Sequence, residues 1–151
     1  MAVRIVRSAT ATWSGTVPDG GGRFVLGSGA FEGPFTLRAR VEDGQHTANP
    51  EELIGLGHAG CFTMSLADLL STEGHPPADL STEARVHLEQ TDGGWAITRI
   101  ELSTRGEVDG VDGETFERLA QQAKATCPVS RALAGTEITL VAELAPNRRE
   151  S

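Results

Sequence analysis

One long uncharged segment constrains the fold of this 151-residue chain more than any other feature of its sequence. From Leu53 to Ala67 no residue is charged, and apolar residues occupy most of the circumference of a helical wheel. The segment follows Asn49-Pro50-Glu51-Glu52, which places an asparagine at the N-cap, a proline at the first helical position and a glutamate at the third, as in a capping box. We therefore predict a helix over about residues 50–71 that is buried on all sides.

Strand-like segments on both sides of this helix supply part of its cover. Between about residues 3 and 41 short β-branched and aromatic runs alternate with glycine-rich turns, and Phe35 to Val41 alternates with period two, which puts Arg38 and Arg40 on one strand face. Between about residues 80 and 145 the sequence predicts strands over 81–90, 95–107 and 137–144, a helix over about 112–126 and the start of a second helix at Cys127.

These elements predict an α+β fold in one domain over residues 1–151, with antiparallel sheets packed around a long buried central helix. A chain of this length has little material to surround such a helix completely. A second subunit is an economical source of the remaining cover, so we expect a homodimer.

The net charge and the hydropathy of the sequence limit the classes of partner that we expect. The chain carries 13 Lys and Arg against 21 Asp and Glu, a net charge of −8, which opposes binding to phosphate backbones, so we expect no nucleic-acid partner. No segment comes close to the roughly 20 consecutive apolar residues of a membrane span, and no apolar stretch follows the first basic residues as in a secretory signal. We therefore expect no membrane association and a cytoplasmic protein.

The only two cysteines stand at positions where helix chemistry matters. Cys61 falls in the middle of the predicted central helix, whereas Cys127 precedes Pro128 at the predicted start of another. Two thiols without a secretory signal do not form a disulfide framework; they serve redox chemistry, bind metal or pack as inert apolar side chains. The residues alone leave redox and inert roles open.

A metal site is the weakest of these possibilities. His58 lies three residues before Cys61 and so on nearly the same helical face, which would allow zinc with Cys127 and either His46 or His75. A structural zinc site requires a fourth ligand, and the sequence has no Cys-x-x-Cys pair. We expect no bound metal, and a position for His58 beside the thiols.

Three motifs in order give the chain a specific resemblance. They are Asn49-Pro50-Glu51-Glu52-Leu53-Ile54-Gly55, His58-Ala59-Gly60-Cys61-Phe62 and Ala123-Lys124-Ala125-Thr126-Cys127-Pro128-Val129-Ser130. Together they resemble the OsmC/Ohr family of hydroperoxide-reducing proteins, in the OsmC branch. The resemblance implies an OsmC-like intertwined dimer that works as a thiol-dependent peroxidase on organic hydroperoxides in oxidative or osmotic stress defence.

The same resemblance implies roles for the thiols. Cys61 would attack the peroxide and become a sulfenate, and Cys127 would condense with it to a disulfide. An external dithiol, lipoyl-type or other, would reduce the disulfide, with no bound cofactor. Helix electrostatics and burial alone predict that Cys127 is the more acidic thiol, because Cys127 lies at a helix start and Cys61 lies in a helix interior.

An arginine is expected to activate the attacking thiol, and an acid to hold that arginine. The resemblance puts these roles on Arg40 and Glu51; the connection to Asn49 is one residue longer than usual, which leaves Arg38 as an alternative. Glu51 precedes Cys61 by ten residues, about 15 Å along a continuous helix, so it can hardly serve the Cys61 of its own chain directly. It could reach a neighbouring subunit's thiol if two such helices cross antiparallel, which leaves open which subunit supplies Glu51 to each site.

Apolar residues near the motifs are candidates for a pocket that favours alkyl hydroperoxides. These are Phe62, Met64, Phe35 and Leu66, with His58 lining or flanking the thiols. A non-enzymatic redox sensor, or a stress protein that binds an apolar ligand, would have the same features in its sequence.

Overall fold

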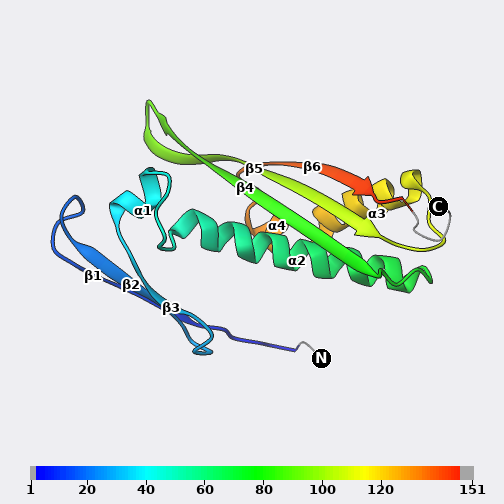
Figure 1. Ribbon diagram of the computed structural model, residues 1–151, viewed down its shortest axis with the longest axis horizontal. Coiled ribbons are helices and arrows are strands. Elements are labelled where there is room, and N and C mark those ends of the chain that lie inside the picture. Colours follow the sequence, from blue (N-terminus) through cyan, green and yellow to red (C-terminus); the bar gives the residue numbers. More distant parts are fainter. Residues whose placement is uncertain (1–2, 147–151) are drawn as a thin grey trace. The chain divides into compact units, whose positions relative to one another are not determined.

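A computed structural model describes residues 3–146, which fall into two compact units, Met1–Leu53 and Ile54–Ser151. The first contains strands β1 (Ala9–Ser14), β2 (Gly21–Leu26) and β3 (Glu32–Phe35) and helix α1 (Leu37–Val41), and helix α2 (Pro50–Thr72) begins in it. The remaining elements belong to the second unit (Figure 1). A single domain over the whole chain stays a prediction.

The first unit is an antiparallel sheet in the order β1-β2-β3 with an aromatic cluster on one face. Phe24 and Phe35 stack with ring centroids 3.8 Å apart, and Trp13 lies 5.3 Å from Phe35. Gly22 makes room for this cluster, since a Cβ there would lie 2.6 Å from the Phe35 ring. The N-terminal hairpins predicted from the glycine-rich turns are confirmed.

The predicted strand from Phe35 to Val41 is wrong, because β3 ends at Phe35 and α1 follows. The Thr36 side chain caps α1 by accepting a hydrogen bond from the backbone N–H of Ala39 at 3.2 Å. Arg38 pairs with Glu42 one turn later. These local contacts favour a helical turn over the alternating pattern, so Arg38 and Arg40 do not share a strand face.

Helix α2 is confirmed over Pro50–Thr72. Asn49 Oδ1 accepts from the backbone N–H of Glu52 at 2.9 Å, as expected for the N-cap. The return contact differs from a capping box, since Glu52 accepts from the Asn49 side-chain amide at 2.7 Å. The same amide also donates to the Ala39 carbonyl, which ties α1 to the start of α2.

The second unit is built on a sheet in the order β4-β5-β6. Strands β4 (Asp79–Thr91) and β5 (Gly94–Glu107) form a long antiparallel hairpin, and β6 (Glu137–Leu144) pairs with β5 in parallel. The sheet is therefore mixed, which corrects the prediction of antiparallel sheets only. The cause is the connection through helices α3 (Gly113–Thr126) and α4 (Pro128–Ala132), which returns the chain to the end where β5 starts.

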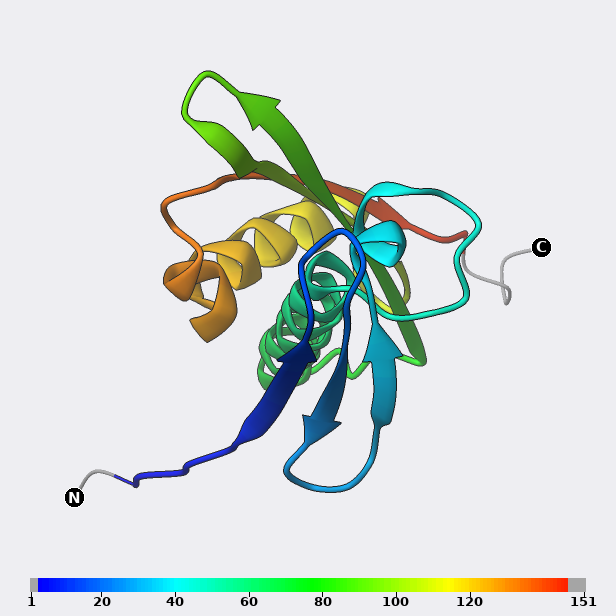
Figure 2. The same cartoon turned by 90° about the vertical axis from the view of Figure 1, so that its left-hand side faces the viewer.

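Helices α2 and α3 lie on the same side of this sheet, and the core fills the space between (Figures 1 and 2). The predicted apolar stripe of α3, at Phe116, Leu119, Ala120 and Ala123, is buried there as expected. Gly106 of β5 permits this packing, because a Cβ at that position would lie 2.7 Å from the Phe116 ring. The other core members are Phe62, Leu66, Leu70, Ile100, Leu102, Val108 and Cys127.

The prediction that α2 is buried on all sides is wrong for a single chain. Its buried residues recur on one face, whereas Leu56 is 72% and Met64 76% exposed. By length and composition alone α2 could cross a membrane, a test that core helices of water-soluble proteins also pass; 28% of its most apolar window is buried. Helix α2 therefore has one buried face and one exposed apolar face within this chain.

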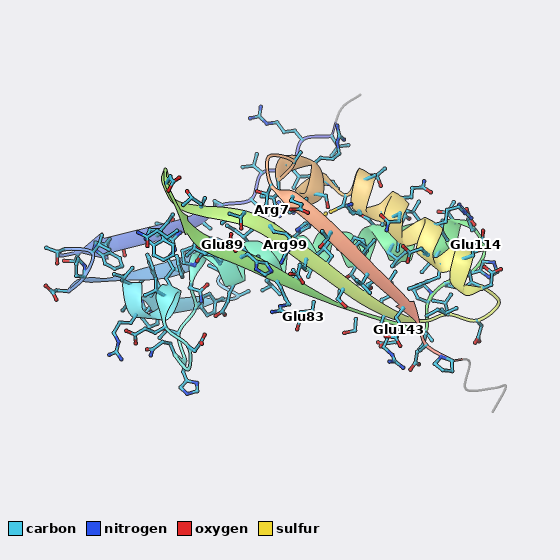
Figure 3. All side chains as sticks on the ribbon, turned by 90° about the horizontal axis from the view of Figure 1, so that it is seen from above. Arg7, Glu83, Glu89, Arg99, Glu114 and Glu143 are labelled. Carbon is cyan, nitrogen blue, oxygen red and sulfur yellow. The ribbon has the colours of Figure 1, made fainter. Side chains whose placement is uncertain are left out.

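The outer face of the β4-β5-β6 sheet is charged, with Glu83, Arg99 and Glu143 on successive strands (Figure 3). Glu101 accepts from Arg99 at 2.8 Å and contacts His87 at 2.7 Å. The His87 hydrogen bond and the neighbouring arginines hold the pKa of Glu101 below its ordinary value. This face is suited to water, whereas the opposite face carries the core.

Candidate functional site

The two thiols meet in the second unit. Cys61 lies in the middle of α2, and Cys127 connects α3 to α4 as the C-cap of one and the N-cap of the other. Both are free cysteines, and the Cys61 S–H donates a hydrogen bond to the Cys127 sulfur. Cys127 is completely buried, whereas Cys61 is partly exposed. Two cysteines far apart in the sequence are thus placed next to each other in the fold.

The surroundings of the two thiols push their pKa values in opposite directions. Burial raises the pKa of Cys61, and its hydrogen bond to Cys127 raises it further. Burial also acts to raise the pKa of Cys127, but the Cys61 thiol, the backbone N–H and hydroxyl of Ser130 and the backbone N–H of Val129 bring that pKa below its ordinary value. The second unit alone therefore favours a thiolate on Cys127, as the helix-start argument predicts.

A buried polar pair adjoins the thiols. His58 is fully buried on α2, and its Nε2 lies 2.7 Å from Ser130 Oγ of α4. Burial lowers the pKa of His58, so its ring is neutral near pH 7. Ser130 was missed in the sequence, although the spacing Cys127-x-x-Ser130 places it one helical turn after the thiol.

The first unit holds the predicted arginine and glutamate as an ion pair. Arg40 Nε lies 2.9 Å and Nη2 2.7 Å from the same Glu51 oxygen, Oε1. The other oxygen, Oε2, is buried without a hydrogen-bond partner among the described residues. Arg38 instead pairs with Glu42 in solvent, its side chain 70% exposed. The geometry thus gives Arg40, and not Arg38, a buried carboxylate partner.

An apolar pocket of about 170 Å³ adjoins Arg40 within the first unit. Its lining consists of Trp13, Val17, Phe35, Thr36, Leu37, Arg40 and Pro50. Of the residues predicted to line a pocket, Phe35 is in this set. Phe62 and Leu66 are fully buried in the core of the second unit, and Met64 is exposed on α2. Only tertiary placement distinguishes these apolar residues, so sequence pattern alone did not find Trp13 or Leu37.

Within residues 3–146, no group of three or more His, Cys, Asp or Glu side chains is arranged to hold a metal ion. The roles of Cys61, Cys127, Arg40 and Glu51 in a reaction remain predictions. Their arrangement can nevertheless be stated chemically: one unit holds a guanidinium at an apolar pocket, and the other holds two thiols able to form a disulfide.

Known proteins resemble this chain in sequence and in fold. The chain is 42% identical to peroxiredoxin OsmC of Escherichia coli over 137 residues, which cover 90% of this chain and 94% of that protein. The organic hydroperoxide resistance protein OhrB of Bacillus subtilis is 26% identical, with a TM-score of 0.69 over 91% of this chain and 98% of its own.

The organic hydroperoxide resistance protein of Elizabethkingia anophelis shares the fold, with a TM-score of 0.75 at 23% identity over 95% of this chain and 100% of its own. The α+β architecture predicted from the motifs is therefore confirmed. The model of the family described as OsmC-like protein matches residues 42–141, which include both cysteine motifs. The chain belongs to the OsmC-like family.

Proposed function

We propose that this protein is a cysteine-based peroxidase that reduces organic hydroperoxides to alcohols. The observation that carries the proposal is the contact between Cys61 and Cys127, which puts two free thiols within reach of one disulfide. The relatives named peroxiredoxin and organic hydroperoxide resistance protein support the same activity and a role in stress defence.

In the first step the Cys61 thiolate attacks one oxygen of the hydroperoxide. The S–O bond forms, the O–O bond breaks, and the alkoxide takes a proton to leave as the alcohol, while Cys61 becomes a sulfenic acid. Because burial raises the pKa of Cys61, the step requires a cation at the sulfur and the leaving oxygen. Arg40, held by Glu51, is the residue we assign to that role.

In the second step the sulfenic acid is consumed. Cys127 attacks the Cys61 sulfur, the disulfide forms, and the hydroxyl group leaves as water. An external dithiol, lipoyl-type or other, then reduces the disulfide by thiol–disulfide exchange and regenerates both thiols. No bound cofactor enters this cycle, and the need for reduced dithiols keeps the cytoplasm as the expected location.

The pocket beside Arg40 supports an organic substrate rather than hydrogen peroxide. Trp13, Phe35 and Leu37 present apolar surface next to the guanidinium. An alkyl or aryl group would bury its carbon atoms there and gain roughly 25 cal/mol per Å² of surface removed from water. Its peroxide group would then lie toward the charge.

We further propose that two copies complete each site. Ten residues of continuous α2 separate Glu51 from Cys61, about 15 Å along the axis, so the Arg40–Glu51 pair of one subunit is assigned to the thiols of its partner. The open face of α2 supports a second copy as its cover. Besides Leu56 and Met64 it carries Gly57 and Gly60, where an added Cβ would meet no atom within 4 Å.

Turnover separates the proposed enzyme from a non-enzymatic sensor. Reduced protein with excess dihydrolipoamide should consume many equivalents of cumene hydroperoxide, and a Cys61→Ser variant should consume none beyond the rate of the dithiol alone. Consumption that stops at one equivalent would identify a sensor that forms its disulfide once. No disulfide and no consumption would contradict both.

A further inference from the structure

His58 and Ser130 form a polar pair where the surrounding core is apolar. His58 is 0% and Ser130 5% exposed, and the 2.7 Å contact joins α2 to α4 beside both thiols. Burying two polar side chains costs desolvation free energy, whereas apolar side chains of similar shape would pack there without that cost. The pair therefore calls for a role besides packing.

The direction of the hydrogen bonds follows from the number of protons available. The Ser130 hydroxyl has one proton and lowers the pKa of Cys127, one helical turn earlier in the chain, so we assign that proton to the Cys127 sulfur. Ser130 Oγ must then accept from His58, so the proton of the neutral ring lies on Nε2. Nδ1 of His58 is buried without a partner, and an N–H there would have no acceptor among the described residues. The surroundings thus fit one tautomer.

We infer that His58 and Ser130 form a donor chain that holds Cys127 as the attacking thiolate of the disulfide-forming step, with Ser130 touching the reacting sulfur and His58 positioning Ser130. The inference rests on the proposed peroxidase function and assigns these two residues to its second step. The Cys127 sulfur attacks the sulfenic sulfur of Cys61, the S–S bond forms and the S–O bond breaks. The departing hydroxide combines with the proton that Cys127 has given up, so one water is released.

The first step, the reaction of Cys61 with peroxide, does not use this donor chain. The groups that act on the Cys61 pKa are Cys127, the Val129 N–H and Ser65, and neither His58 nor Ser130 is among its hydrogen-bond partners. Removing the Ser130 hydroxyl should therefore slow disulfide formation and leave the reaction of Cys61 with peroxide nearly unchanged. A residue that only stabilised the fold would not divide the two steps in this way.

Quenched-flow mass spectrometry of the reduced full-length protein, mixed with one equivalent of cumene hydroperoxide, measures both steps. For Ser130→Ala and His58→Leu we expect disulfide formation to be about tenfold slower or more, with sulfenate formation within about twofold of wild type. His58→Gln retains an N–H donor near the position of Nε2 and should recover most of the rate. Thr104→Val removes another buried hydroxyl of this unit and serves as the matched control.

Three results would overturn the inference: equal slowing of both steps, an unchanged second step in Ser130→Ala, or a His58→Gln variant as slow as His58→Leu. Ser130→Ala alone decides the matter if His58→Leu does not fold, since it removes a single oxygen. Failure of the proposed function is distinguishable, because wild-type protein with excess dithiol would then consume no more than one equivalent of cumene hydroperoxide, whereas the inference is judged on the two rates of a single oxidation.

Discussion

The first unit holds a charged pair beside an apolar pocket, whereas the second holds two thiols in an apolar core. In the proposed mechanism each unit holds a group that the reaction also needs. The guanidinium of Arg40 has no thiol in its unit, since both cysteines of the chain lie beyond residue 53. The pKa of the Cys61 thiol is raised within its own unit, and the proposed mechanism therefore assigns its activation to a cation outside that unit. Catalysis is therefore expected to depend on both units in different ways.

The largest expected effect separates the two thiols of the second unit. Cys61→Ser should abolish peroxide consumption, because the attacking sulfur is removed. Cys127→Ser should permit one oxidation per subunit and then stop, because the first O–O cleavage needs only Cys61. Mass spectrometry after one equivalent of peroxide should find a sulfenate or a more oxidised Cys61 in Cys127→Ser. First-step oxidation confined to Cys127 in the wild type would reverse the assignment, and its lowered pKa makes this check necessary.

The second-largest expected effect follows from removing the Arg40 charge of the first unit. Arg40→Ala should slow the reaction with cumene hydroperoxide by on the order of 10² or more, since it removes a preorganised charge from the thiolate and the leaving oxygen. Arg38→Ala is the matched control and should have much less effect, because Arg38 pairs with Glu42 in solvent. Stopped-flow measurement of the second-order rate constant compares them, and exchanged effects would place the catalytic arginine at Arg38.

A smaller effect concerns the pocket. Trp13→Ala should raise KM for cumene hydroperoxide about fivefold to tenfold, the loss expected for roughly 1 kcal/mol of apolar contact, and should leave the rate with hydrogen peroxide nearly unchanged. Trp95→Ala at the exposed start of β5 is the control. Equal losses with both peroxides would mean that the pocket does not bind the organic group.

The smallest effect is on stability in acid. Burial lowers the pKa of His58, so below about pH 6.5 the unfolded chain binds a proton that the folded chain does not, and stability falls as the pH falls. This one histidine can lower the free energy of unfolding by up to about 2 kcal/mol between pH 7 and pH 5. Urea unfolding at both pH values should show a smaller acid loss in His58→Gln than in wild type or in the His87→Gln control. Equal losses in all three would exclude His58 as the cause.

The sequence was most informative where the determinants are local. The N-cap at Asn49, the apolar stripe of α3 and the alternation of the β4–β5 hairpin predicted their elements correctly. The strand predicted from Phe35 to Val41 failed because Thr36 caps a helical turn, a contact that hydrophobic periodicity does not record. The parallel pairing of β6 depends on the path of α3 and α4 and has no local signal.

The candidate site likewise contains residues that the sequence indicated and residues that only the folded chain identifies. The roles that the resemblance gives to the two thiols, Arg40 and Glu51 stay predictions. The structure adds two separate facts: the thiols adjoin each other in one unit, and Arg40 pairs with Glu51 in the other. Ser130 and the residues around Trp13 needed the folded chain, because their neighbours are far from them in sequence. We propose that a second copy of the chain covers the α2 face that carries Leu56 and Met64.

Exchange of subunits between two inactive variants tests most directly whether the charge of one unit serves the thiol of another chain. Arg40→Ala and Cys61→Ser are each expected to be nearly inactive alone. After subunit exchange, a heterodimer regains one complete site, made of the intact arginine of one chain and the intact thiol of the other, while its second site lacks both. We expect about half of the wild-type activity per heterodimer, with heterodimers counted by native mass spectrometry. Heterodimers that remain inactive, or a protein that stays monomeric at micromolar concentration, would contradict it.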